Sequence, residues 1–304
     1  MGKEQRITRI RTWFKWSLGA LWFLDGLLQL QPGMFSMDMI SAIMQPALSG
    51  QPVWMSHLGN WAITIVSPWI GLVNWGFAGI QLLIGILLLM KNQRWVRWGL
   101  WISIAWGLTV WLFGEGLGSI LTGTATALNG APGSVILYVW IAVILLLPDS
   151  AWCLGRTRCW IRDGVSLLWL LAALQQAIPG YWTSVGLSSV FQGNLMMQPR
   201  WFVNLLNPVV AYSAKNPHFL NGTLVVLMLI SGLLLLYGHR WTFWGFWLGT
   251  ALLLFMWIYG QGLGGVFTGM GTDPNAAPLW WLLMLPAYFT RNDARTKSDT
   301  AQAA

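Results

Sequence analysis

Two similar glycine-rich segments place polar side chains at the ends of apolar stretches. WLFGEGLGSILTG spans residues 111–123 and WIYGQGLGGVFTG spans residues 257–269, with Glu115 in the first replaced by Gln261 in the second. Ionisable groups inside or beside membrane-type apolar runs are costly, so Glu115 is a candidate for ligand, ion or proton handling. The glycines recur at every second residue, which one helical face cannot hold, and therefore predict a turn with close backbone approach. They are Gly114, Gly116, Gly118, Gly260, Gly262 and Gly264.

A second acid, Asp25, interrupts another apolar run, and Gln29 follows one helical turn later on the same face. We expect one cavity shared by two parts of the chain, in which a single acid, Glu115, faces the amide of Gln261. Three alternatives stay open: a salt bridge that fixes the two parts, a protonated and hydrogen-bonded acid, or a Glu115 that only caps a backbone N–H. The residues expected to line this cavity are Asp25, Gln29, Glu115, Gln176, Gln261, Arg200 and Lys215.

Other site chemistries are not expected. There is no nucleophile–base pair, metal triad or redox cysteine pair, and Cys153 and Cys159 at C-x5-C spacing are predicted to be two free thiols. The GLG segments lack the strand–GxGxxG–helix context and the P-loop lysine of nucleotide sites. His57, His218 and His239 lie near the ends of apolar stretches, which disfavours haem. Met34, Met37, Met39 and Met44 favour core packing over a copper site.

The composition indicates an integral membrane protein. Of the 304 residues, 56% are hydrophobic and 9% are charged, against about 25% charged in soluble domains. Spanning helices need about 20 mostly apolar residues. The chain predicts eight: 13–31, 69–90, 95–113, 133–148, 164–178, 218–237, 241–259 and 277–290.

The basic residues predict the orientation. Of the 17 Lys and Arg, all but Arg200 and Lys215 fall in the N-terminus, in loops 91–97 and 149–163, in the turn at Arg240 and in the tail. The positive-inside rule then places both termini in the cytoplasm of a multi-pass plasma-membrane protein. The net charge of +8 is thereby explained without a nucleic-acid partner. Segments 36–57 and 183–213, broken by prolines, are predicted to be interfacial or re-entrant structure on the opposite side.

The chain repeats itself. QLQPG (29–33) matches QAIPG (176–180) and Asn74 matches Asn221 at an offset of 147, while the GLG segments and Pro132–Pro278 match at 146. We therefore expect an all-α fold of two tandem, same-orientation four-helix repeats, with a ligand site between them. The expected domains are 1–148 and 164–290, joined by a cytoplasmic linker 149–163 and followed by a disordered tail 291–304.

Both parts resemble the DoxX-like group of four-helix membrane proteins. The resemblance lies in WSLGALWFLDGLLQL (16–30) and in the Pro-aromatic, Asn-Pro and Gly-ended helix pattern of residues 198–241. Where members commonly carry Glu, this chain has Gln81 and Met228. The group includes DoxD, a membrane subunit of thiosulfate:quinone oxidoreductases, so the resemblance implies a quinone-linked oxidoreductase component with a membrane or periplasmic redox partner. A small-solute, ion or proton transporter and a non-catalytic assembly subunit are the alternatives.

Overall fold

The computed structural model describes residues 3–153, 155–238 and 240–289, and these fold into helices joined by short turns without a β-strand. The expected disordered tail and His239 lie outside the described residues. The first half (residues 1–148) contains α1 Lys3–Leu28, η1 Pro32–Phe35, η2 Ile40–Met44, α2 Gln45–Ala47, α3 Val53–Val66, η3 Ser67–Trp69, α4 Ile70–Leu89, α5 Gln93–Phe113, η4 Gly116–Thr122, η5 Ala127–Asn129 and α6 Ser134–Leu146.

The predicted linker 149–163 contains α7 Asp149–Cys153 and the first turns of α8 Arg156–Gln176, and α8 continues into the second half (residues 164–290). The remaining elements are η6 Pro179–Trp182, α9 Ser184–Gln192, η7 Gly193–Leu195, α10 Arg200–Lys215, α11 Pro217–Tyr237, α12 Trp241–Phe255, η8 Met256–Gly260, η9 Gly262–Gly265 and α13 Ala276–Phe289. Each of the eight predicted spans therefore coincides with a long part of one helix.

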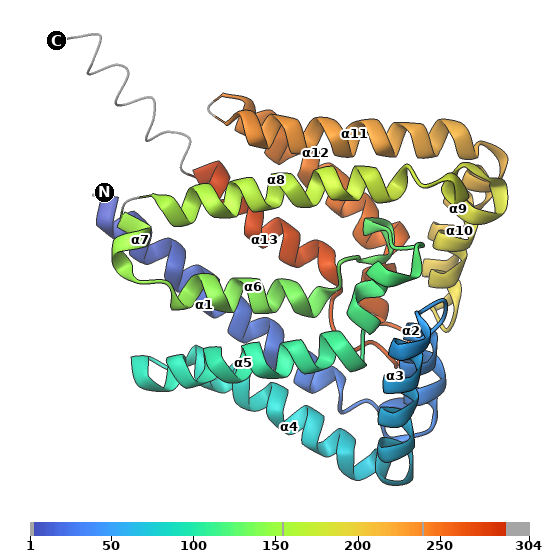
Figure 1. Ribbon diagram of the computed structural model, residues 1–304, viewed down its shortest axis with the longest axis horizontal. Coiled ribbons are helices and arrows are strands. Elements are labelled where there is room, and N and C mark those ends of the chain that lie inside the picture. The colour runs from blue at the N-terminus through green and yellow to red at the C-terminus, as the bar shows by residue number, and fades with distance from the viewer. Residues whose placement is uncertain (1–2, 154, 239, 290–304) are drawn as a thin grey trace.

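The long helices run alongside one another, and α2, α3, α9 and α10 lie across one end of the bundle (Figure 1). We call this end, which holds Glu115 and Gln261, the motif end. Segments 36–57 and 183–213 are helical over most of their length, and their interfacial or re-entrant position stays a prediction. Pro52 and Pro199 stand at the N-caps of α3 and α10, where a missing N–H costs nothing.

The opposite end is fixed by basic side chains. Arg11 of α1 forms an ion pair with Asp149 of α7, and Lys15 donates to the carbonyl oxygen of Met90, 3.0 Å away. We call this the basic end. Two buried aromatic pairs, Trp22–Tyr138 and Trp169–Trp280, mark the core of the first and second half respectively.

Four helical stretches in the described part of the chain are long and apolar enough to cross a membrane: Val53–Leu89, Gln93–Phe113, Pro217–Tyr237 and Trp241–Gly260. Ser134–Leu146 and Ala276–Tyr288 are apolar but shorter. The exposed faces of these stretches carry large apolar side chains, such as Leu72, Trp101 and Phe219. Such apolar helices are typical of a membrane protein.

Candidate functional site: a cavity at the motif end

A cavity of about 830 Å³ opens at the motif end. The first half supplies most of its wall, from α1, η2, α3, α4, α5 and the segment 113–135, and the second half adds Asn194, Thr272, Asp273 and Asn275. Three carboxyl-bearing residues line it: Asp25, Glu115 and Asp273. Its volume lies within the roughly 300–1,000 Å³ of small-molecule sites.

The glycine-rich segments form two left-handed turns, in agreement with the predicted turn. Leu117, Gly118 and Ser119 have φ values of 56, 61 and 59°, and Leu263 and Gly264 have 55 and 71°. A left-handed backbone costs an L-residue about 1–2 kcal/mol, so glycine lowers the cost of such a run. Each turn is held by a glutamine: Gln51 donates to the Gly116 oxygen at 2.7 Å and Gln198 to the Gly262 oxygen at 3.2 Å.

Glu115 caps a helix. Its Oε1 accepts from the backbone N–H of Ser134 at 2.9 Å and from the Ser134 hydroxyl at 2.6 Å, at the start of α6. Gln261 does the same at α13, where its Oε1 accepts from the N–H of Ala277 at 3.0 Å. Both side chains thus satisfy backbone donors that helices leave unpaired at their first turn. The capping alternative accounts for both contacts, and Glu115 additionally faces the cavity.

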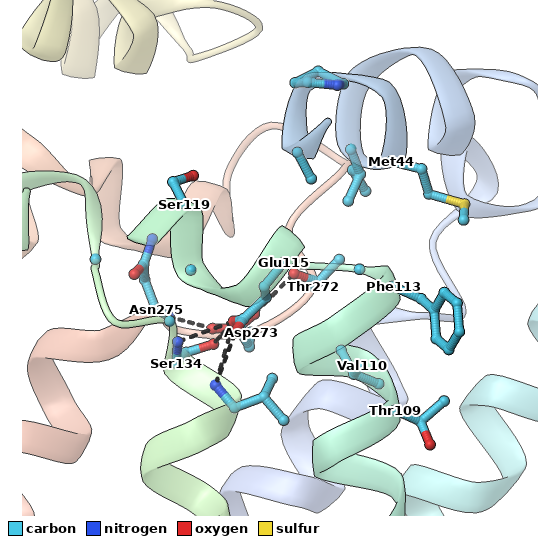
Figure 2. Close-up of a pocket in the computed structure, with 18 of the residues that line it drawn as sticks. Met44, Thr109, Val110, Phe113, Glu115, Ser119, Ser134, Thr272, Asp273 and Asn275 are labelled. Carbon is cyan, nitrogen blue, oxygen red and sulfur yellow. Dashed lines mark hydrogen bonds between the residues drawn. The ribbon is translucent and has the colours of Figure 1, made fainter. Parts of the chain in front are cut away.

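The expectation of a single acid is wrong, because Asp273 brings a second carboxyl from the other half (Figure 2). Asp273 accepts from the Thr272 hydroxyl at 2.9 Å and from the backbone N–H of Asn275 at 2.7 Å. Burial, and then the nearby Asp273 carboxylate, raise the pKa of Glu115 to about 8. The signal in the sequence is the Asp-Pro-Asn segment 273–275, which follows the second glycine-rich segment.

Gln29 and Gln176 occupy matching positions but have different surroundings. The side-chain amide of Asn74 donates to the backbone oxygen of Gln29 at 2.8 Å, and that of Asn221 donates to the backbone oxygen of Gln176 at 3.1 Å. The side chain of Gln176 also donates to Asn221 at 2.6 Å and accepts from Thr126 of the first half. The Oε1 of Gln29, by contrast, is buried without a hydrogen bond.

The structure brings together only part of the predicted site. Asp25, Gln29 and Glu115 line the cavity, while Gln176 and Gln261 are held in contacts between the halves and do not. Arg200 and Lys215 are exposed at opposite ends of α10 and are not among the lining residues, so the predicted closure of the cavity by a base is wrong. The reason is that α10 lies across the end of the bundle, at its periphery (Figure 1).

The matching of residues also changes within the motif-end loops. Thr122 and Thr268 make the same bonds, to Ser119 and Gly265, at the predicted offset of 146. The residues after Thr122 and Thr268 match differently. Trp111 and Trp257 match at an offset of 146, but Trp111 donates to the oxygen of Pro132 and Trp257 to the oxygen of Pro274. Pro132 therefore matches Pro274, at an offset of 142, and the predicted match of Pro132 with Pro278 is wrong. The offset falls from 146 to 142 because the second loop is four residues shorter.

Within the described residues, no group of three or more His, Cys, Asp or Glu side chains could hold a metal ion. Cys153 and Cys159 are free and exposed, as predicted. The cavity therefore offers carboxyls, amides and aromatic rings, which suit recognition of a small molecule. Comparisons with protein-family models, with curated proteins and with solved structures find no match to this chain.

Proposed function

We propose that this protein is a multi-pass membrane carrier of small solutes, with its binding site in the motif-end cavity. The observation that carries the proposal is the cavity itself, built by both halves and lined by carboxyls from both. Transporters assembled from two similar units commonly bind their substrates where the units meet. The same-orientation repeat is supported by the paired bonds of Asn74 and Asn221 and of Gln51 and Gln198.

Eight spans with both termini cytoplasmic complete the proposal. The basic end holds Arg11 and Lys15, and the first turns of α5 and α8 carry further arginines. By the positive-inside rule this end faces the cytoplasm of a plasma membrane and the cavity faces outward. A membrane-impermeant maleimide added to intact cells should then label Asn129→Cys and Asn275→Cys but not Asn92→Cys. Labelling of Asn92→Cys alone would reverse the orientation.

A quinone-linked component of the DoxX/DoxD type is the second candidate. The cavity walls include flat apolar rings from Trp22, Phe77, Trp106 and Phe113. A reduced quinone could donate its hydroxyl hydrogens to the acceptors of Asp25 and Gln29. An oxidised quinone presents only carbonyl acceptors and fits these groups less well.

Transport is tested with the full chain in proteoliposomes. Uptake of a radiolabelled panel of small cations, anions and neutral solutes should be saturable for at least one class. Ala62→Trp places a bulky ring in the cavity wall and should abolish that uptake, whereas Ala105→Trp, on an exposed position of α5 outside the cavity, should not. Equal uptake in liposomes with and without protein for every solute would overturn the carrier proposal.

A further inference from the structure

We propose that the cavity takes an organic ammonium ion, whose N–H groups bind Asp25, Gln29 and Gln81 and whose apolar body lies against the aromatic wall. This inference rests on the proposed function, since it names the class of solute for the same cavity.

The first argument is the set of polar atoms left without partners. Among the residues lining the cavity, the buried side-chain atoms without a hydrogen bond are Asp25 Oδ1, Gln29 Oε1, Gln81 Oε1 and Trp106 Nε1. The side chains of Asp25, Gln29 and Gln81 belong to residues only 3, 5 and 5% exposed. A buried polar group left unsatisfied costs about 1–3 kcal/mol. These three buried acceptor oxygens favour a ligand that carries N–H groups.

The second argument comes from the matching positions of the other half. Asp25 corresponds to Ala172 and Gln81 to Met228, both buried, with exposures of 1 and 0%. The same pair of packed helices therefore forms with apolar side chains at these positions. Asp25 and Gln81 are not required by the helix packing, and their polarity needs another reason, which a bound ligand supplies.

The third argument is charge. Carboxyl-bearing Asp25, Glu115 and Asp273 line the cavity, and no Lys, Arg or His is among its lining residues. Glu115 and Asp273 already accept hydrogen bonds from protein groups, whereas Asp25 Oδ1 accepts none. The polar side chain beside the Asp25 carboxyl is the Tyr138 hydroxyl, which carries no positive charge. An uncompensated buried carboxylate is strongly disfavoured unless it is paired. A cationic ligand provides the missing partner.

The fourth argument is size and wall chemistry. About 830 Å³ far exceeds what a bare metal ion needs, and the described residues contain no metal-type cluster. Trp22, Trp106 and Phe77 line the same space as Asp25. Aromatic faces attract ammonium groups and bury hydrocarbon, which selects an amine with an apolar body over a small hydrated ion.

The test uses isothermal titration calorimetry on the full chain in nanodiscs, at pH 7 and constant ionic strength. The cationic probes are benzylammonium, 2-phenylethylammonium and 3-phenylpropylammonium; the uncharged and anionic probes are 2-phenylethanol, methylhydroquinone and 3-phenylpropionate. We expect at least one of the three ammonium ions to bind at least tenfold more tightly than 2-phenylethanol, and 3-phenylpropionate not to bind.

The variants separate the contact from the fold. Asp25→Asn should weaken the ammonium ion at least tenfold and bring its affinity close to that of 2-phenylethanol. Gln81→Met, which installs the residue of the other half, should weaken it about threefold with an unchanged thermal midpoint. Asp38→Asn, an exposed acid outside the cavity, should leave binding unchanged.

The outcomes distinguish this inference from the proposed function. Tighter binding of methylhydroquinone or 3-phenylpropionate than of every ammonium ion would overturn the ammonium ligand, and so would an unchanged affinity in Asp25→Asn. If no probe binds while the proteoliposomes show Ala62-dependent uptake, the ligand class is wrong and the carrier stands. If both assays are negative, both proposals fail.

Discussion

Asn74 and Asn221 each hold the backbone oxygen of a glutamine, at 2.8 and 3.1 Å, but the space behind the two glutamines differs. In the second half, the Gln176 side chain accepts from Thr126 and donates to Asn221, so both of its polar atoms are bonded. In the first half, the side-chain oxygens of Gln29 and Asn74 have no hydrogen-bond partner, and a cavity opens beside Gln29. The same Asn–Gln contact thus lies in a packed interface in the second half and beside a polar cavity in the first half. The contrast teaches that the backbone oxygen of Gln29 serves the helix packing, whereas its side-chain oxygen, Oε1, belongs to the cavity.

The largest effect is expected where both halves share a left-handed turn. A Cβ on Gly118 would overlap the carbonyl of Pro132, at φ +61°. Gly118→Ala should cost about 3 kcal/mol, from backbone strain and overpacking together. Gly123→Ala, at φ +73° with nothing within 4 Å of the added carbon, should cost only about 1 kcal/mol. Denaturant titration in micelles compares the free energies of unfolding of the two variants. Equal losses would show that the Pro132 segment moves to make room for the added carbon.

The next effect separates the two asparagines. Asn221→Leu removes the bond to the Gln176 oxygen and strands the Gln176 side-chain amide, whereas Asn74→Leu strands only the Gln29 oxygen. The free energy of unfolding should fall further in Asn221→Leu, by about 1–3 kcal/mol. Equal losses in the same titration would mean that Gln29 and Asn74 are as firmly held as their counterparts, and would remove the contrast between the halves.

A smaller and pH-dependent effect is expected at Glu115. Burial, followed by Asp273, raises its pKa from an ordinary 4.5 to about 8. The folded state then keeps a proton that the unfolded chain releases, so the stability that Glu115 contributes falls as pH rises from about 4.5 to about 8. Glu115→Gln should fold well, because Gln261 caps α13 with the same amide oxygen. The thermal midpoint of the wild type, minus that of Glu115→Gln, should decrease over this range; a constant difference would contradict the shifted pKa.

The smallest effect is expected outside the comparison. Cys153 and Cys159 are free and exposed. The double serine variant should change stability by less than about 0.5 kcal/mol and leave uptake unchanged. Loss of uptake in a folded double variant, measured in the proteoliposome assay, would reveal a thiol function away from the cavity.

Hydrophobic runs predicted the long helices well, because an apolar stretch of this length has few other stable forms. The glycine spacing predicted the left-handed turns for a similar reason, since few residue types adopt that backbone. Asp25 and Glu115 were predicted to line one cavity because an ionisable group beside an apolar run is costly, and both lie in the cavity wall.

The rest depended on relations that sequence spacing does not encode. Arg200 was expected at the cavity because it and Lys215 are the two bases predicted on the side opposite the other Lys and Arg residues, but α10 carries Arg200 to an exposed position. Asp273 was missed because a turn-forming Asp-Pro looks the same whether it faces water or a second carboxyl. The four-residue shortening of the second loop, which brings Asp273 to Glu115, was hidden by chance matches at the wrong offset.

Residues 124–127 also bear on the order in which the chain is made. The oxygen of Thr124 accepts from Tyr181, the hydroxyl of Thr126 donates to Gln176, and the oxygen of Ala127 accepts from Gln261. All three partners are synthesised later than the segment that they satisfy. A nascent chain of which only the first 148 residues have been synthesised therefore carries a loop without these partners, and the cavity wall is completed only when the last helices have been made. Chains truncated at that point should be recognised by quality-control proteases, whereas full-length chains escape them.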